Sequence, residues 1–331
     1  MKASSLPALL QGFFTERLRS QLGASAHTVA TYRDPFRLLL RFAAERFKQV
    51  PSEVRVEQLD PSFVGDFLRQ LEADRGNCAR TRNVRLAALR AFFRYVAVNE
   101  PAHALQCQRL LAMPAKRYQR DPVEFLTDEE VAALVAAPNL DLWLGRRDRA
   151  ILMVAAQTGL RNSEITGLRR QDVEFGAGAH LRCLGKGRKT RCTPLTTDAT
   201  AVLKKWLTEQ GRDVGDPVFP TSRGRHISAE ALQRLVARHA ATASDRCSSL
   251  KGKKVTPHTL RHTAAMSLLR RGVDLTVTAL WLGHESTETT QVYLHADMTL
   301  KERALAHGTS SGATPPRYRP ADPLLTFLES L

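Results

Sequence analysis

The chain has 331 residues, of which 43% are hydrophobic, and a formal net charge of +16 at pH 7. This length suggests two domains, each large enough for its own core, and the hydrophobic fraction is that of a soluble globular protein. No apolar run of about 18 residues and no signal peptide are present, so we expect neither a membrane-spanning helix nor secretion.

The excess of positive charge predicts a polyanionic partner. Nucleic acid is the first candidate, and an anionic membrane surface is the competing one. The cysteines are odd in number and form no CxxC pair, which indicates free thiols in a reducing cytoplasm and no zinc cage; they are Cys78, Cys107, Cys183, Cys192 and Cys247.

Residues 1–113 are expected to form an all-α domain. Helical spacing of apolar residues covers 6–21, 27–47, 61–75, 78–98 and 103–112. Ser25 or Thr28 can cap the second of these helices, and Pro35 predicts a kink or a split within it.

The helix expected at 78–98 has one apolar face and one face rich in arginine. Its apolar residues are Val84, Leu86, Leu89, Phe92, Phe93 and Val96, and its arginines are Arg80, Arg82, Arg85, Arg90 and Arg94. The arginines fit a solvated face and phosphate contact equally well in isolation. The basic character of the whole chain favours phosphate contact.

Residues 114–126 break the periodicity and are expected to be a basic interdomain linker. Prolines flank Lys116, Arg117 and Arg120. Such a linker could lie along a nucleic-acid backbone.

Residues 127–309 are expected to form a second domain of mixed structure. It opens on the capping-box pattern Thr127-Asp128-Glu129-Glu130. Residues 172–195 alternate and contain four glycines, which predicts a small antiparallel sheet with Lys186 at one of its turns. Helices are expected at 127–137, 145–158, from the turn at 158–165, and at 198–210, 228–243, 257–271, 274–282, 286–295 and 298–307.

Residues 310–331 are expected to be a flexible arm that ends in a short apolar helix. Such a helix is not stable alone and must dock on its own body or on a neighbouring subunit. Its apolar face consists of Leu324, Leu325, Phe327, Leu328 and Leu331.

The chemistry is concentrated in residues 258–293. His258 and Arg261 lie three positions apart and so share one face of a helix; His284 follows a glycine turn, and Tyr293 lies nine residues further on. Arginine offers forked donors to phosphate, and tyrosine can act as a covalent nucleophile.

Plainer interpretations exist for each of these residues. His258 and His262 have the i, i+4 spacing of a zinc helix, but Thr259 stands where the metalloprotease pattern has glutamate. We interpret His262 as a satisfied structural residue. A lone tyrosine is more often packing than chemistry, so the conjunction of these residues carries the prediction.

Four separated stretches make the chain similar to the tyrosine recombinases, the phage-integrase type of site-specific recombinase. They agree with that family in order and spacing and cover the region from about 127 to 307. The stretches are TGLRNSEITGL (158–168), LGKGRKTRCTPL (184–195), TPHTLRHTAAMSLL (256–269) and LWLGHESTETTQVYLH (280–295). Ile165 stands where the family commonly has leucine.

The resemblance implies a role for each matching residue. Tyr293 attacks the scissile phosphate to form a 3′-phosphotyrosyl link, and Arg161 and Arg261 brace the non-bridging oxygens. Lys186 protonates the leaving oxygen, His258 assists proton transfer or phosphate binding, and His284 donates a hydrogen bond to the phosphate. Glu164 supports the site without touching the phosphate.

No metal or cofactor is expected, because two arginines with lysine and histidine donors can neutralise the charge of the reacting phosphate. Double-stranded DNA is the expected partner, with a homotetramer on synapsed DNA and a monomer or weak oligomer when free. Arg94, Arg117 and Lys189 are candidate backbone contacts. The resemblance also implies that residues 1–113 bind the core DNA site, and it implies a C-shaped clamp and a cytoplasmic, nucleoid-associated location.

Two alternatives to a recombinase remain within this resemblance. A DNA-binding protein could have kept the fold and lost catalysis, although all six catalytic positions are filled. A type IB-like topoisomerase would relax supercoiled DNA without a target site. Among recombinases, the sequence favours integration, excision or transposition of a mobile element over chromosome dimer resolution or inversion.

Overall fold

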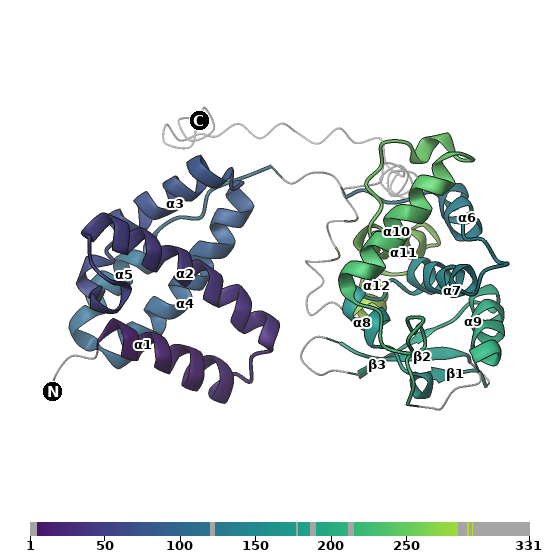
Figure 1. Cartoon of the computed structure of the whole chain (residues 1–331), viewed down its shortest axis with the longest axis horizontal. Coiled ribbons are helices and arrows are strands. Elements are labelled where there is room, and N and C mark those ends of the chain that lie inside the picture. Colours follow the sequence, from purple (N-terminus) through teal and green to yellow (C-terminus); the bar gives the residue numbers. More distant parts are fainter. Residues whose placement is uncertain are drawn as a thin grey trace, which may run out of the picture. The chain divides into compact units, whose positions relative to one another are not determined.

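The computed structural model describes residues 5–119, 123–176, 178–185, 190–210, 215–283, 290 and 293. The chain divides into two compact units, Met1–Arg120 and Asp121–Leu331. The described part of the first unit is helical, and the second combines helices with a small antiparallel sheet (Figure 1). The fold class predicted from the sequence, mainly α with a small antiparallel sheet, is therefore confirmed.

The helices of the first unit pack around α4. It contacts α2, α3 and α5 and buries Leu89, Phe92 and Phe93 among them. In chain order the elements are α1 (Leu6–Gly12), a π-helical stretch (Phe13–Gln21), α2 (Ala26–Phe47), α3 (Pro61–Arg75), α4 (Ala79–Asn99) and α5 (Ala104–Ala112), with short 3₁₀ turns at Pro51–Glu53, Val56–Gln58 and Pro101–His103.

Local capping explains where the predicted helices begin and end. The Ser25 side chain accepts a hydrogen bond from the Thr28 backbone N–H, and that of Asp60 accepts one from Phe63 at 2.7 Å. Helix α3 ends at Gly76, whose φ of 58° lies in the left-handed region that glycine favours.

Two details of this unit differ from the sequence-based expectation. The split considered at Pro35 does not occur, because α2 is continuous from Ala26 to Phe47; one lost backbone hydrogen bond is outweighed by burial of the adjacent turn, including Phe36. Val84 is 50% exposed and does not join the apolar face, because two residues turn a helix through about 200° and Leu86 is already buried.

The second unit packs around α7, which contacts α6, α9 and α11. Most of the α7 side chains are buried. The elements are α6 (Asp128–Ala136), α7 (Trp143–Thr158), α8 (Asn162–Gly167), β1 (Val173–Glu174), β2 (His180–Leu184), β3 (Thr190–Pro194), α9 (Thr197–Gln210), α10 (Ala229–Ser244), α11 (Pro257–Arg270) and α12 (Leu275–Leu282), with 3₁₀ turns at Arg170–Asp172 and Ser248–Leu250.

The strands form one antiparallel sheet in the order β1-β2-β3. Its register pairs Val173 with Leu181 and Cys183 with Arg191. The β2–β3 connection contains Lys186 and Lys189, which lie outside the described residues, as do the helices expected at 286–295 and 298–307 and the arm at 310–331.

The first residues of the predicted linker are hydrogen-bonded to the first unit, and its last residue is hydrogen-bonded to the second. Lys116 Nζ lies 2.8 Å from Glu72 Oε2, and the Lys116 backbone N–H donates to Asn83 Oδ1. At the other end, the Leu126 backbone N–H donates to Thr263 Oγ1 at 2.9 Å. Lys116 is therefore already paired with a carboxylate within the first unit.

The capping box predicted at Thr127 is present and is joined to a buried ion pair. Thr127 Oγ1 accepts from the Glu130 backbone N–H, and Glu130 Oε2 accepts from that of Thr127. Glu130 is fully buried, and Lys253 Nζ lies 2.7 Å from its Oε1. This contact fixes the start of α6 to the loop before α11.

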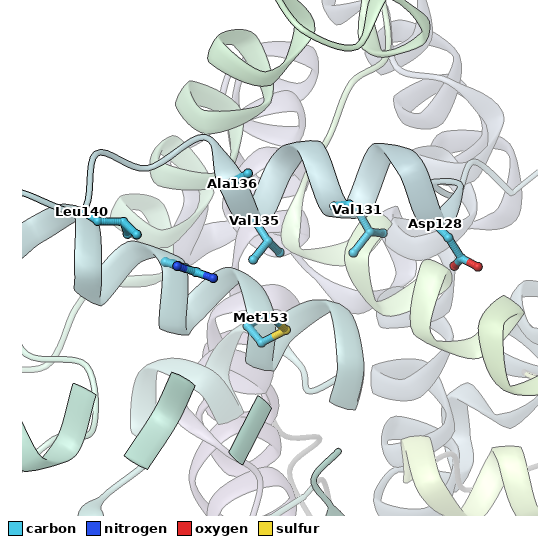
Figure 2. A pocket seen from close by; sticks show the side chains of 8 residues that line it. Asp128, Val131, Val135, Ala136, Leu140 and Met153 are labelled. Carbon is cyan, nitrogen blue, oxygen red and sulfur yellow. The ribbon is translucent and has the colours of Figure 1, made fainter. Parts of the chain in front are cut away.

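An apolar pocket of about 350 Å³ lies along α6 and α7 (Figure 2). Its lining residues are Asp128, Val131, Ala132, Val135, Ala136, Leu140, Arg149 and Met153. A second pocket shares Asp128, Val131 and Met153 with it and reaches α11. Among the residues that the structure describes, no helix is both long and apolar enough to cross a membrane.

Candidate active site

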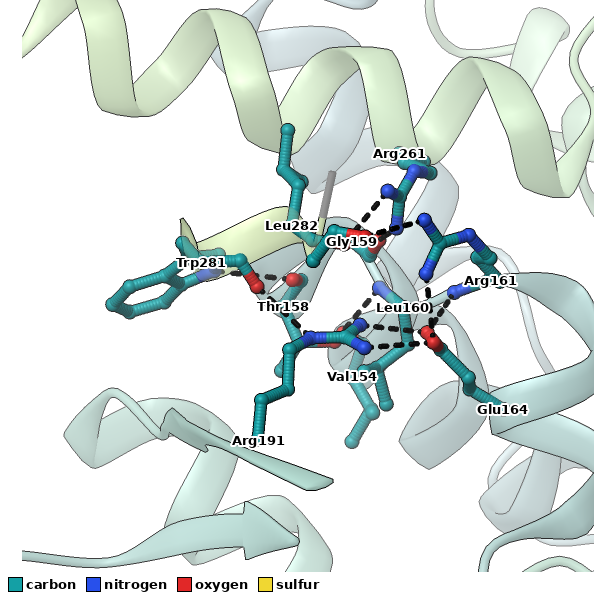
Figure 3. A network of polar contacts seen from close by, with 11 residues as sticks. Val154, Thr158, Gly159, Leu160, Arg161, Glu164, Arg191, Arg261, Trp281 and Leu282 are labelled. Carbon is teal, nitrogen blue, oxygen red and sulfur yellow. Dashed lines mark hydrogen bonds and ion pairs between the residues drawn. The ribbon is translucent and has the colours of Figure 1, made fainter. Parts of the chain in front are cut away.

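Arg161 is positioned by the turn between α7 and α8. Helix α7 ends at Gly159, and Arg161 is the N-cap residue of α8. Its NH1 donates to Glu164 Oε1 at 3.0 Å and its NH2 donates to the carbonyl oxygen of Gly283 at 2.6 Å (Figure 3). These contacts fix the guanidinium while leaving the side chain 29% exposed.

Arg261 extends from α11 into the same place and is only 3% exposed. Its NH1 donates to the carbonyl oxygen of Gly159 at 2.6 Å, and its NH2 donates to that of Leu282 at 2.7 Å (Figure 3). Burial, together with the nearby charge of Arg161, lowers the pKa of Arg261 to about 10. It is still cationic at neutral pH, so two guanidinium groups repel each other in a site that would be stabilised by an anion.

A buried carboxylate lies between the arginines. Glu164 is 8% exposed, and both of its oxygens accept hydrogen bonds from Arg191 at 2.7 Å. Burial alone would raise the pKa of the Glu164 carboxyl, but the hydrogen bonds from Arg191 and from the Arg161 backbone N–H outweigh it, and the net pKa is lowered. Glu164 is therefore ionised, and both of its oxygens accept hydrogen bonds from arginines.

This network joins three segments that are distant in sequence: the turn between α7 and α8, strand β3 and the end of α12 (Figure 3). Arg191 of β3 also donates from Nε to the carbonyl oxygen of Trp281, at 3.2 Å, and the indole N–H of Trp281 donates to Thr158. Gly159 has a φ of +64°, and a Cβ there would lie 2.7 Å from Leu282 Cδ2. The turn can approach α12 this closely because the residue is glycine.

Tyr293 is buried beside these groups. It is 2% exposed, and its hydroxyl is hydrogen-bonded to Nδ1 of His262 at 2.8 Å. The two rings are edge to face with centroids 5.4 Å apart. Burial raises the pKa of the Tyr293 phenol above its ordinary value, and the charge of Arg261 acts in the opposite direction.

His258 lies in the first turn of α11, where Thr256 caps the helix. Its side chain is exposed. Its ring contacts that of His262, with the centroids 4.2 Å apart. The two imidazoles therefore extend from the Tyr293 hydroxyl toward solvent.

The structure brings together Arg161, Glu164, Arg261 and Tyr293, with His258 next to them through His262. Lys186 and His284 lie outside the described residues, as does Lys189. Arg94 and Arg117 are exposed residues of the first unit.

Two residues of this site were not singled out from the sequence. Arg191 was noted only for its charge; it shares the inner face of β3 with buried Thr193, a period-two signal that points it away from solvent. His262 is interpreted from the sequence as a satisfied structural residue, and the structure shows that its Nδ1 is hydrogen-bonded to the Tyr293 hydroxyl. Its position one turn after His258 was the available signal.

The sequence and the fold match a known family. The phage integrase family profile matches residues 124–299, and the N-terminal SAM-like domain of phage integrases matches residues 12–99. The chain therefore belongs to the phage integrase family. Members of this family are tyrosine recombinases, enzymes that cleave and rejoin DNA through a tyrosine intermediate.

Two relatives and one solved structure illustrate how similar the chain is to individual members of this family. The Sinorhizobium fredii protein y4rC, whose name assigns it to the integrases and recombinases, is 52% identical over 100% of this chain and 99% of its own length. Tyrosine recombinase XerC of Pelobacter propionicus is 34% identical over 86% of this chain and 90% of its own. A crystal structure of XerH site-specific recombinase bound to palindromic difH substrate has a TM-score of 0.69 at 23% identity, covering 88% of this chain and 83% of that one.

Proposed function

We propose that this protein is a site-specific DNA recombinase that integrates, excises or transposes a mobile element, with Tyr293 as its nucleophile. The observation that carries the proposal is the placement of the buried Tyr293 phenol near the guanidinium of Arg261, which in turn lies close to that of Arg161. A phosphodiester is an anion whose equatorial oxygens gain charge during displacement, and this pair of arginines is built to bind such a group.

In the proposed reaction the Tyr293 oxygen attacks the scissile phosphorus, and the bond to the 5′ oxygen of the next nucleotide breaks. The products are a 3′-phosphotyrosyl link and a free 5′-hydroxyl. Arg161 and Arg261 stabilise the non-bridging oxygens, Lys186 protonates the leaving oxygen, and His258 and His284 assist. The covalent link conserves the energy of the phosphodiester, so rejoining needs no ATP.

Glu164 contributes without touching the phosphate. A carboxylate beside the reacting group would repel it, but the Glu164 charge is neutralised by two arginines. The role we assign to it is to orient the Arg161 guanidinium. The site then presents its hydrogen-bond donors before the substrate arrives, which is the arrangement that stabilises a developing charge best.

DNA is the proposed partner of both units. We assign residues 1–113 as the domain that binds the core DNA site, 114–126 as the linker and 127–309 as the catalytic domain. The net charge of +16 favours a nucleic-acid surface, and Arg94, Arg117 and Lys189 are assigned to the phosphate backbone. Such a protein works where the DNA is, in the cytoplasm and at the nucleoid.

The similarity to y4rC favours a mobile-element role. That protein is 52% identical to this chain over its whole length and is named among integrases and recombinases. Chromosomal resolution of the XerC type is the competing role. Replicons carrying two copies of the ends of the encoding element should recombine without ATP. A topoisomerase would instead relax a plasmid that lacks these ends, and a catalytically silent protein would only bind.

Assembly on DNA is proposed to use the C-terminal segment in a homotetramer. The apolar pocket on α6 and α7 (Figure 2) matches the apolar face expected for the last helix, and the buried Arg149 Nε there makes no hydrogen bond within the described structure. We propose that this segment docks on a neighbouring protomer. A chain lacking 313–331 should bind single sites but lose synapsis, and intact recombination by it would refute this assignment.

A further inference from the structure

The hydrogen bond between Tyr293 and His262 raises the question of where the phenol proton goes. A buried phenol with a raised pKa is protonated at neutral pH, and a neutral phenol is a poor nucleophile. Proton transfer in the transition state needs an acceptor within hydrogen-bond reach of the oxygen. His262 Nδ1, at 2.8 Å from the hydroxyl oxygen, meets this geometric condition.

The other charged groups that the structure describes at this site are poor acceptors. The guanidinium groups of Arg161 and Arg261 carry donors and no acceptor. The Glu164 carboxylate accepts hydrogen bonds from Arg161 and Arg191 on its two oxygens, and its pKa is lowered. A neutral imidazole with its proton on Nε2 leaves a lone pair on Nδ1, directed at the phenol.

We propose that His262 is a catalytic residue that takes the proton of Tyr293 during DNA cleavage and returns it during rejoining. The inference rests on the proposed function and adds a residue to it. As the Tyr293 oxygen–phosphorus bond forms and the phosphorus–5′ oxygen bond breaks, the phenol proton passes to His262 Nδ1, and the 5′ oxygen takes its proton from Lys186. On rejoining, the 5′-hydroxyl oxygen attacks the phosphorus and returns its proton to the neutral Lys186 amine, while the phosphorus–tyrosine oxygen bond breaks and the proton on His262 Nδ1 returns to the tyrosine oxygen.

The position of His258 supports this path. Its exposed ring lies against that of His262, on the preceding turn of α11. A positive charge formed on His262 is thereby close to a second imidazole and to solvent, so it need not be held in a closed apolar site. Arg261, the residue before His262 in α11, carries a charge that favours the phenolate that forms on Tyr293.

A purely structural contact predicts a different outcome. If His262 only holds Tyr293 in a resting position, its removal frees the nucleophile and cleavage becomes faster or stays unchanged. If His262 is the proton acceptor, its removal slows cleavage by roughly 10²-fold or more, the usual contribution of general base catalysis. The sign of the effect therefore separates the two roles.

The experiment measures single-turnover cleavage of a nicked suicide DNA substrate by the full-length chain, at saturating protein. The variants are His262→Ala and His262→Asn. Asparagine places a hydrogen-bonding atom close to the Nδ1 position but cannot take a proton at neutral pH. We expect both variants to lose at least about 10²-fold, whereas recovery of the rate by asparagine would overturn the proposal.

A second arm keeps the test independent of folding defects. Each protein is also made with a difluorotyrosine at position 293, because fluorine lowers the pKa of a phenol and reduces its need for a base. We expect the loss in His262→Ala to be at least tenfold smaller with this nucleophile. An equal loss with both nucleophiles would overturn the His262 proposal alone, whereas adduct formation by Tyr293→Phe would overturn the proposed function itself.

Discussion

Glu164 is an anion in a site that is proposed to bind an anion, and its partners explain how this is tolerated. Arg191 binds both of its oxygens, and Arg161 binds it through the backbone and the side chain. A buried carboxylate is stable only when it is paired and hydrogen-bonded. Glu164 therefore serves the site by fixing two guanidinium groups.

Lowering the pH should remove the contribution of the Glu164 carboxylate to folding stability. Because the pKa of Glu164 is lowered in the folded protein, its carboxylate stabilises the fold at pH values above the ordinary value of 4.5, and the gain disappears as pH falls through the folded-state pKa. Urea unfolding of the wild-type and Glu164→Gln proteins between pH 7 and pH 4 measures the difference in their free energies of unfolding. We expect the stability difference to be largest near pH 7 and to shrink toward pH 4; a difference that grows in acid would contradict the assignment.

Gly159 is a second residue on which the site depends. Alanine there must adopt a φ of +64° and place its Cβ 2.7 Å from Leu282. Gly252 offers a matched control, because its φ is +81° and nothing lies within 4 Å of a Cβ there. Both changes cost about 1–2 kcal/mol for the left-handed conformation, and Gly159→Ala should cost about 1–3 kcal/mol more through overpacking. Equal losses in thermal unfolding would show that the close approach to α12 is unimportant.

At the scale of elements, Arg191 joins strand β3 to α8 and to the end of α12. This connection places the strand that follows Lys186 against the turn that carries Arg161. Removing one partner of a buried ion pair leaves the other charge uncompensated, which typically costs about 3–5 kcal/mol.

Arg191→Met should therefore destabilise the second unit by about 3–5 kcal/mol. Glu164→Gln combined with Arg191→Met should lose less stability than the sum of the two single changes, because neither charge is then left alone. Unfolding followed by tryptophan fluorescence gives the four values that are needed. Strict additivity would indicate that the two side chains do not interact.

The elements that the sequence predicted well are those with strong local signals. Helix α3 has Asp60 at its start and Gly76 at its end, and its predicted bounds match the structure. The network around Glu164 could not be predicted in the same way, because Arg191 lies 27 residues from Glu164 in the chain and only the fold brings them together. The contact of His262 with Tyr293 could not be predicted either, because helical spacing places a residue on one face of a helix without revealing what lies opposite.

At the scale of the whole molecule, the two units have separate apolar cores. The core of the first unit includes Phe92, which is fully buried. All three tryptophans of the chain, Trp143, Trp206 and Trp281, lie in the second unit. Tryptophan fluorescence therefore reports on the second unit alone.

Phe92→Ala should destabilise the first unit by about 3–5 kcal/mol, the usual cost of emptying a core aromatic position. We expect far-UV circular dichroism to show an earlier transition while the fluorescence transition stays where it is in the wild type. A matching shift in both signals would mean that the two units unfold as one body.

The central claim is that Tyr293 becomes covalently attached to DNA. The most direct measurement incubates the protein, without added metal or ATP, with suicide substrates drawn from the ends of the encoding element. Wild type should yield a protein–DNA adduct with a free 5′-hydroxyl, and the Tyr293→Phe protein should bind the same DNA and yield none. An adduct that survives the substitution would contradict the assignment of Tyr293, and wild-type binding without any adduct would contradict the proposed catalysis.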